Sequence, residues 1–234
     1  MFGDVVFLLG VFAPGLIALA LTEANDGRAA TRALFNRVLK WDVGARFYVF
    51  AIAFIPAVKL LAALLNRIVL GAWPKFGDTS VVLMLLVLMV STWAQAGEEL
   101  GWRGYALPRM WERIGLGPAS IFLGMIWATW HLPLFFVFNG DTLGQSFPLY
   151  ALQVTAISVV MGWLYWRSEG SLLIVMLFHA AVNNLKDIVP SASPVASGAF
   201  SLRASPVGWF TVALLWIAAV YFLVQMRNAK PLTR

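Results

Sequence analysis

Residues 80–107 read SVVLMLLVLMVSTWAQAGEELGWRGYAL, and this segment is the strongest indication of the fold class. Its first half is almost continuously apolar and lacks the polar–apolar alternation of a barrel strand, so it reads as a helix long enough to cross about 30 Å of hydrocarbon. Its second half carries Glu98, Glu99 and Arg103. Because ionisable groups at membrane depth are costly, they mark a functional site by default.

The composition of the whole chain agrees with a membrane protein. Hydrophobic residues make up 61% and charged residues 12% of the sequence, and the mean hydropathy is +0.80. A soluble domain has about half apolar and about a quarter charged residues. We therefore predict one all-α membrane domain over residues 1–234, a polytopic bundle of about seven transmembrane helices. The expected spans are residues 4–21, 47–66, 80–107, 118–138, 147–166, 171–188 and 207–226.

The basic residues predict the topology. The loop after the first expected span holds Arg28, Arg32, Arg37, Lys40 and Arg46, which the positive-inside rule assigns to the cytoplasm. We expect an integral protein of the cell (inner) membrane, with its N-terminus outside and its C-terminus cytoplasmic. Residues 28–40 have the pattern of an interfacial amphipathic helix.

The charge and the cysteine count exclude several classes of function. The net charge is +6, but the basic residues lie at the ends of apolar segments, where membrane lipid and topology explain them, so we predict no nucleic-acid partner. The chain has 0 cysteines, which excludes disulfides, thiol nucleophiles and thiolate metal sites. The sequence indicates no oligomeric state.

Ionisable residues of three expected helices lie at a similar depth in the membrane. At 1.5 Å per residue from the expected cytoplasmic helix ends, Glu98 lies about 15 Å, His131 about 20 Å and His179 about 12 Å along its helix. All three fall in the cytoplasmic half of the bilayer. We therefore expect one shared polar cavity that opens toward the cytoplasm.

Spacing along the helices divides these residues into pairs. Glu99 and Arg103 are four residues apart and can form an ion pair. His179 and Asn183 have the same separation, so their side chains can point into one cavity. Glu98 is rotated by about 100° from Glu99, so one carboxylate can face the cavity while Arg103 neutralises the other.

This set of groups suits hydrolysis. A carboxylate and an imidazole in a shielded cavity can deprotonate water and later protonate a leaving amine. A second histidine and an asparagine can donate to the oxyanion on the attacked carbonyl. No serine, threonine or cysteine stands in an obvious nucleophile motif, which favours attack by activated water over a covalent intermediate.

The ordered pattern resembles the CPBP (CAAX protease and bacteriocin-processing, or Abi) family of intramembrane endopeptidases. Its motifs are E-E-x-x-x-R, F-x-x-x-H and H-x-x-x-N. Glu98, Glu99 and Arg103 match the first, His131 the second, and His179 with Asn183 the third. Trp127 stands where the second motif usually has phenylalanine. The resemblance covers a catalytic core over about residues 80–190.

By analogy with the type II CAAX prenyl endopeptidases of this family, the resemblance implies a role for each residue. Glu98 and His131 would activate water, His179 and Asn183 would form the oxyanion hole, and Glu99 with Arg103 would support them. The mechanism needs no cofactor and no metal. The implied partners are membrane lipid and a peptide or protein substrate, with a C-terminally lipidated one among the candidates.

Two other functions fit the same residues. Two histidines and a glutamate are a familiar zinc set, so a zinc-dependent membrane metalloprotease is one alternative, although the H-E-x-x-H motif is absent. A non-catalytic binding, immunity or transport protein is the other. We interpret Trp102, Trp127, Trp130 and Trp163 as packing and interface residues. Lys59 either snorkels or pairs with a carboxylate.

Overall fold

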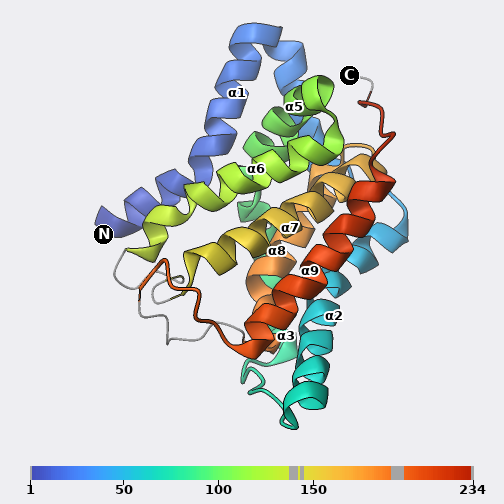
Figure 1. Cartoon of the computed structure of the whole chain (residues 1–234). Helices are drawn as coiled ribbons and strands as arrows, with labels where there is room; N and C mark the ends of the chain where they lie inside the picture. The colour runs from blue at the N-terminus through green and yellow to red at the C-terminus, as the bar shows by residue number, and fades with distance from the viewer. Residues whose placement is uncertain (1, 137–141, 143–144, 191–197, 233–234) are drawn as a thin grey trace.

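The computed structural model describes residues 2–136, 142, 145–190 and 198–232, and every regular element in these ranges is helical, as predicted (Figure 1). In chain order the elements are α1 (Phe2–Asn36), η1 (Arg37–Leu39), α2 (Ala45–Leu70), α3 (Val81–Ala94), α4 (Ala96–Glu99), η2 (Leu100–Ala106), α5 (Leu107–Ile114), α6 (Leu116–Trp130), η3 (Leu132–Phe135), α7 (Phe147–Arg167), α8 (Leu172–Leu185), η4 (Lys186–Ile188) and α9 (Pro206–Gln225).

Four helical segments of the described residues are long and apolar enough to cross a membrane: Ala45–Leu70, Val81–Ile114, Phe147–Arg167 and Pro206–Gln225. This agrees with the predicted all-α polytopic membrane bundle, and the four segments coincide with the expected spans 47–66, 80–107, 147–166 and 207–226. The expected spans 118–138 and 171–188 correspond to α6 and α8, which have only 15 and 14 residues and reach about 22 Å. Residues 137 and 138 lie outside the described residues. The expected span 4–21 falls in α1, whose side chains before Gly10 are likewise outside them.

Helices α7 and α8 form the core of the bundle. α6, α7 and α9 lie side by side, and α8 crosses behind them toward α2 and α3 (Figure 1). α8 is apolar on nearly all sides, which is the pattern of a fully enclosed helix, and its residues Ile174, Met176 and Phe178 are completely buried. Because His179 follows directly in this helix, it is held on a rigid, central element.

Helix ends expected on the same side of the membrane do meet. At the end expected to be cytoplasmic, Arg37 Nη1 donates to the Tyr165 hydroxyl at 2.7 Å, joining the segment after α1 to the end of α7. At the opposite end, the Gly77 N–H donates to the Ile188 carbonyl at 3.0 Å. These contacts agree with the predicted alternation of helix directions. Which end faces the cytoplasm stays a prediction.

The predicted amphipathic helix is present at the end of α1. α1 bends sharply at Gly27, whose backbone φ of 80° and ψ of 175° are not helical, and the bend is visible in Figure 1. After it the chain is helical to Asn36 and continues as the 3-10 turn η1. Leu34 and Val38 are buried while Arg28 and Arg32 are exposed, which confirms the amphipathic pattern.

The helix that carries the first motif runs further than predicted. We expected it to end near residue 107 because a proline inside a helix lacks an N–H donor and its ring clashes with the carbonyl four residues earlier. Instead, α3, α4, η2 and α5 form one apolar segment to Ile114. The stretch Leu100–Ala106 is a π-helix, in which the Leu107 N–H bonds to the Trp102 carbonyl. The wider π-turn makes room for Pro108, so the helix continues.

Small residues let α1 pack tightly against this motif helix. A Cβ atom at Gly97 would lie 2.8 Å from the Val11 carbonyl oxygen, and one at Gly101 would lie 2.6 Å from the Pro14 carbonyl. On α1, a Cβ at Gly15 would lie 2.6 Å from the Gly97 carbonyl. Close backbone contact between membrane helices depends on such positions. Gly97 and Gly101 flank the two glutamates, so this contact fixes the backbone of the first motif.

We therefore expect Gly101→Ala to destabilise the protein, because the added methyl group meets backbone atoms that cannot turn away. Overpacking of this kind costs about 1–3 kcal/mol, which should lower the midpoint of thermal unfolding in detergent. Gly10→Ala is the matched control, since a Cβ at Gly10 meets nothing within 4 Å. Equal midpoints for the two variants would contradict the role given to this helix contact.

Candidate active site

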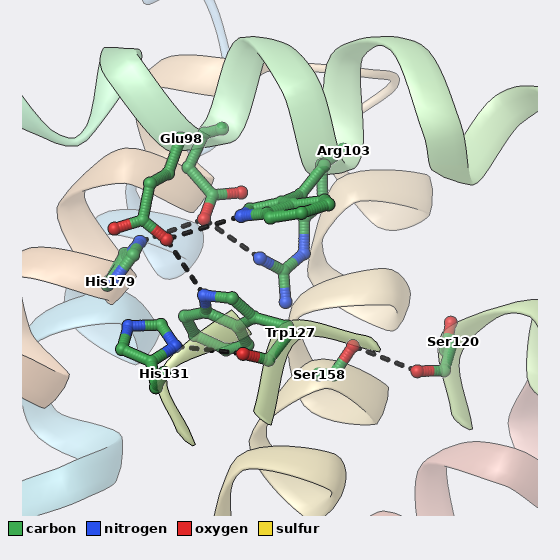
Figure 2. Close-up of polar contacts among 9 residues, drawn as sticks. Glu98, Arg103, Ser120, Trp127, His131, Ser158 and His179 are labelled. Carbon is green, nitrogen blue, oxygen red and sulfur yellow. Dashed lines mark hydrogen bonds and ion pairs between the residues drawn. The ribbon is translucent and has the colours of Figure 1, made fainter. Parts of the chain in front are cut away.

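A buried ionic cluster lies at the centre of the site. Glu99 and Arg103 are both 0% exposed. Glu99 Oε1 accepts from Arg103 Nη1 at 2.8 Å and from His179 Nδ1 at 2.8 Å. In Figure 2 these contacts are the dashed lines that start at the labelled Arg103 and His179. The first contact confirms the ion pair expected from the four-residue spacing. The second ties the motif helix to the middle of α8.

Glu98 occupies a different environment from its neighbour. Its Oε2 atom accepts from Trp127 Nε1 at 2.8 Å and from Trp102 Nε1 at 3.2 Å (Figure 2). No described residue donates a hydrogen bond to the other oxygen, Oε1. The expected division therefore holds: Arg103 pairs with Glu99, and Glu98 keeps one oxygen available for a ligand.

His131 lies beside Glu98 at the end of α6, and its backbone contact fixes the ring. Its Nδ1 atom is 2.8 Å from the Trp127 carbonyl oxygen. A carbonyl can only accept, so Nδ1 carries the proton, and in the neutral ring Nε2 is the acceptor. The imidazole stands 5.7 Å from the Tyr150 ring and 5.8 Å from the Trp127 ring, measured between centroids. This is the tautomer that a general base needs.

His179 is held by Glu99 in a way that limits what it can do. Because its Nδ1 donates to a carboxylate, its Nε2 is an acceptor in the neutral ring and a donor only in the imidazolium. The His179 side chain is almost completely buried, with its ring centroid 5.0 Å from that of Trp127. An oxyanion contact from His179 therefore requires the protonated ring.

Asn183 is placed differently from His179. Its side chain is exposed, and no hydrogen bond joins it to any other described residue. The next residue, Asn184, is the one held in place: its Nδ2 donates to Ser91 Oγ and to the Ala180 carbonyl, both at 2.7 Å. The structure therefore brings together Glu98, His131 and His179 but does not tie Asn183 to them. Its role as an oxyanion donor stays a prediction.

The interpretation of Trp102 and Trp127 as packing residues alone is wrong. Both indole N–H groups donate to the proposed catalytic carboxylate. Trp102 has a sequence signal, because it stands four residues after Glu98 on the same helix. Trp127 has no sequence signal that points to Glu98, because the contact joins residues 29 positions apart.

The structure decides between the two alternatives for Lys59 in part. Lys59 is buried in α2, so it does not snorkel, and the charge of Asp187 acts on it.

The zinc alternative requires a set of converging metal ligands. Within the described ranges, no group of three or more His, Asp or Glu side chains is arranged to hold a metal ion. His179 Nδ1 and Glu99 Oε1 are hydrogen-bonded to each other, so neither atom is directed at a metal position. The donor set thus offers no specific support for a zinc site.

Comparisons with known proteins agree with the motifs. Residues 79–185 match the family described as "Type II CAAX prenyl endopeptidase Rce1-like". A curated relative, the CAAX prenyl protease 2 of Methanococcus maripaludis, is 27% identical over 220 residues, covering 86% of this chain and 80% of the relative. The matched range contains all six motif residues, and they lie on the same segments that form the cluster described above.

The buried cluster predicts a specific pattern of stability. Glu99→Gln leaves the Arg103 guanidinium buried without its counter-ion, which costs about 3–5 kcal/mol. The double variant Glu99→Leu/Arg103→Met removes both charges and should recover part of that loss. Thermal unfolding in detergent measures the difference. If the midpoint temperature of the double variant is no higher than that of Glu99→Gln, the unpaired charge of Arg103 is not the cause of the lost stability.

Proposed function

Because the chain belongs to the family of CAAX proteases and bacteriocin-processing enzymes, we propose that it is a glutamate-type intramembrane endopeptidase whose attacking water is activated by Glu98 and His131. The observation that carries this proposal is the position of Glu98. Two indole donors fix one of its oxygens, no described residue donates to the other, and the charge of Glu98 acts on the His131 ring.

In the proposed reaction, water binds between Glu98 Oε1 and His131 Nε2. As its oxygen attacks the peptide carbonyl carbon, one of these groups takes the proton. The tetrahedral intermediate then collapses, the C–N bond breaks, and the proton passes to the leaving amine. The tautomer of His131 supports this sequence, because the Trp127 carbonyl keeps Nδ1 protonated and leaves Nε2 to accept.

His179 and Asn183 are proposed to stabilise the oxyanion. The proposed contact uses the protonated His179 ring, whose Nδ1 donates to the Glu99 carboxylate. In that state Nε2 donates to the developing negative charge. The exposed Asn183 carboxamide stands one helical turn away and is proposed to add a second donor when a substrate is bound.

The proposed substrate is a peptide or protein that reaches the site from the cytoplasmic side of the membrane. The name of the Methanococcus relative refers to prenylated CAAX proteins, so a peptide with a C-terminal prenylated cysteine is the first substrate to test. The same peptide without its prenyl group shows whether the lipid is recognised.

The direct test replaces the proposed base. We expect Glu98→Gln to lower kcat by about 10²–10⁴-fold, the usual contribution of a general base, with the protein still folded. Cleavage of prenylated and unprenylated peptides by the purified protein measures this. Glu112→Gln is the matched control, because Glu112 is exposed on the same continuous helix. Cleavage that persists in Glu98→Gln would refute the assignment, and a wild type that cleaves neither peptide would favour a binding or transport protein.

A chelator separates this mechanism from that of a metalloprotease. We expect the wild type to keep its activity after prolonged incubation with a strong chelator and removal of bound metal, because the proposed base and donors act without a Lewis acid. Metal analysis of the treated protein verifies the removal. Activity that is lost with the metal and restored by Zn²⁺ would establish the zinc mechanism instead.

A further inference from the structure

We propose that Trp127 is a positioning residue that sets the geometry of both groups of the water-activating pair. This inference rests on the proposed function, since it explains how Glu98 and His131 are held ready for a water molecule. It goes beyond the family motif, which usually has phenylalanine at this position, a side chain without a hydrogen-bond donor.

The indole N–H of Trp127 fixes the carboxylate. Nε1 donates to Glu98 Oε2 at 2.8 Å, the shorter of the two indole contacts to that oxygen. The Trp127 side chain is 3% exposed, and a buried indole N–H needs a partner. Because the contact joins α6 to the motif helix, it also sets the distance between the two elements that carry the proposed bases.

The backbone of the same residue fixes the imidazole. The Trp127 carbonyl accepts from His131 Nδ1 at 2.8 Å. One residue thus holds Oε2 of the carboxylate through its side chain and Nδ1 of the imidazole through its main chain (Figure 2). The atoms left over are Glu98 Oε1 and His131 Nε2, which are the two that the proposed reaction uses.

The face and edge of the indole also contact the ionic cluster. The Arg103 guanidinium carbon lies 4.4 Å from the Trp127 ring centroid, at the distance of a cation–π contact. The His179 ring meets Trp127 edge to face, at an interplanar angle of 82°. A phenylalanine would keep a ring against these two groups, but it has no N–H to donate to Glu98. The functions of ring and N–H can therefore be separated by one substitution.

The experiment compares Trp127→Phe with wild type in the peptide-cleavage assay. We expect kcat to fall by about 10- to 100-fold, the loss of one hydrogen bond to a charged group, with KM and the midpoint of thermal unfolding nearly unchanged. Trp163→Phe is the control, because Trp163 packs against Phe50 and Phe222 away from the site. A kcat equal to wild type, or a rise in KM with lower stability and unchanged kcat, would overturn the inference.

A second measurement does not depend on proteolysis. In protein labelled with ¹⁵N at the indole nitrogens, Trp→Phe variants assign the NMR signal of Trp127 Nε1–H. We expect Glu98→Gln to shift this signal, because the charged acceptor is replaced by a neutral amide, while Glu112→Gln leaves it in place. An unshifted signal in Glu98→Gln would refute the contact. If the signal shifts but the wild type cleaves no peptide, the proposed function fails and the contact stands.

Discussion

The arrangement of the site depends on one buried interaction, the Glu99 carboxylate shared between Arg103 and His179. Two charged side chains with no exposure are costly to bury, and only good geometry and further hydrogen bonds offset that cost. His179 adds such a bond from α8, and the Trp127 ring covers the guanidinium. The cluster therefore joins three helices at one point. A shift of α8 would remove the His179 bond to Glu99, and a shift of α6 would uncover the Arg103 guanidinium.

Adjacent carboxylates perform separate tasks because a helix turns them in different directions. Glu99 faces inward and binds both Arg103 and His179 through Oε1, whereas Glu98 faces α6 and binds two indoles through Oε2. Each has a partner four residues later on its own helix, Arg103 for Glu99 and Trp102 for Glu98. The guanidinium thus binds Glu99, and the neutral indoles bind Glu98, which is the proposed base.

Contacts along one helix could be predicted from the sequence, and contacts between helices mostly could not. The ion pair of Glu99 and Arg103 follows from local spacing, and the common depth of Glu98, His131 and His179 follows from helical rise and topology. The bond from Trp127 to Glu98 depends on how α6 is rotated against the motif helix, which no local pattern reveals. The length of α6 was overestimated because apolar residues continue past the point where this helix ends. The expected span 171–188 corresponds to α8 followed by the 3-10 turn η4, which reaches Ile188.

The π-helix at Leu100–Ala106 has a consequence for how this segment can vary in length. A π-turn holds one more residue than an α-turn, and such a turn is the usual trace of a single inserted residue. Deleting one residue there would return the turn to the width of a regular α-turn and leave the residues beyond it on their present faces. A deletion in the regular helix between Leu107 and Trp111 has no wider turn to absorb it and would rotate everything beyond it by about 100°. Trp111, whose indole donates to the Ala229 carbonyl, would keep its partner in the first case and lose it in the second. The π-turn is thus the place where this helix can change its length by one residue without moving its far end.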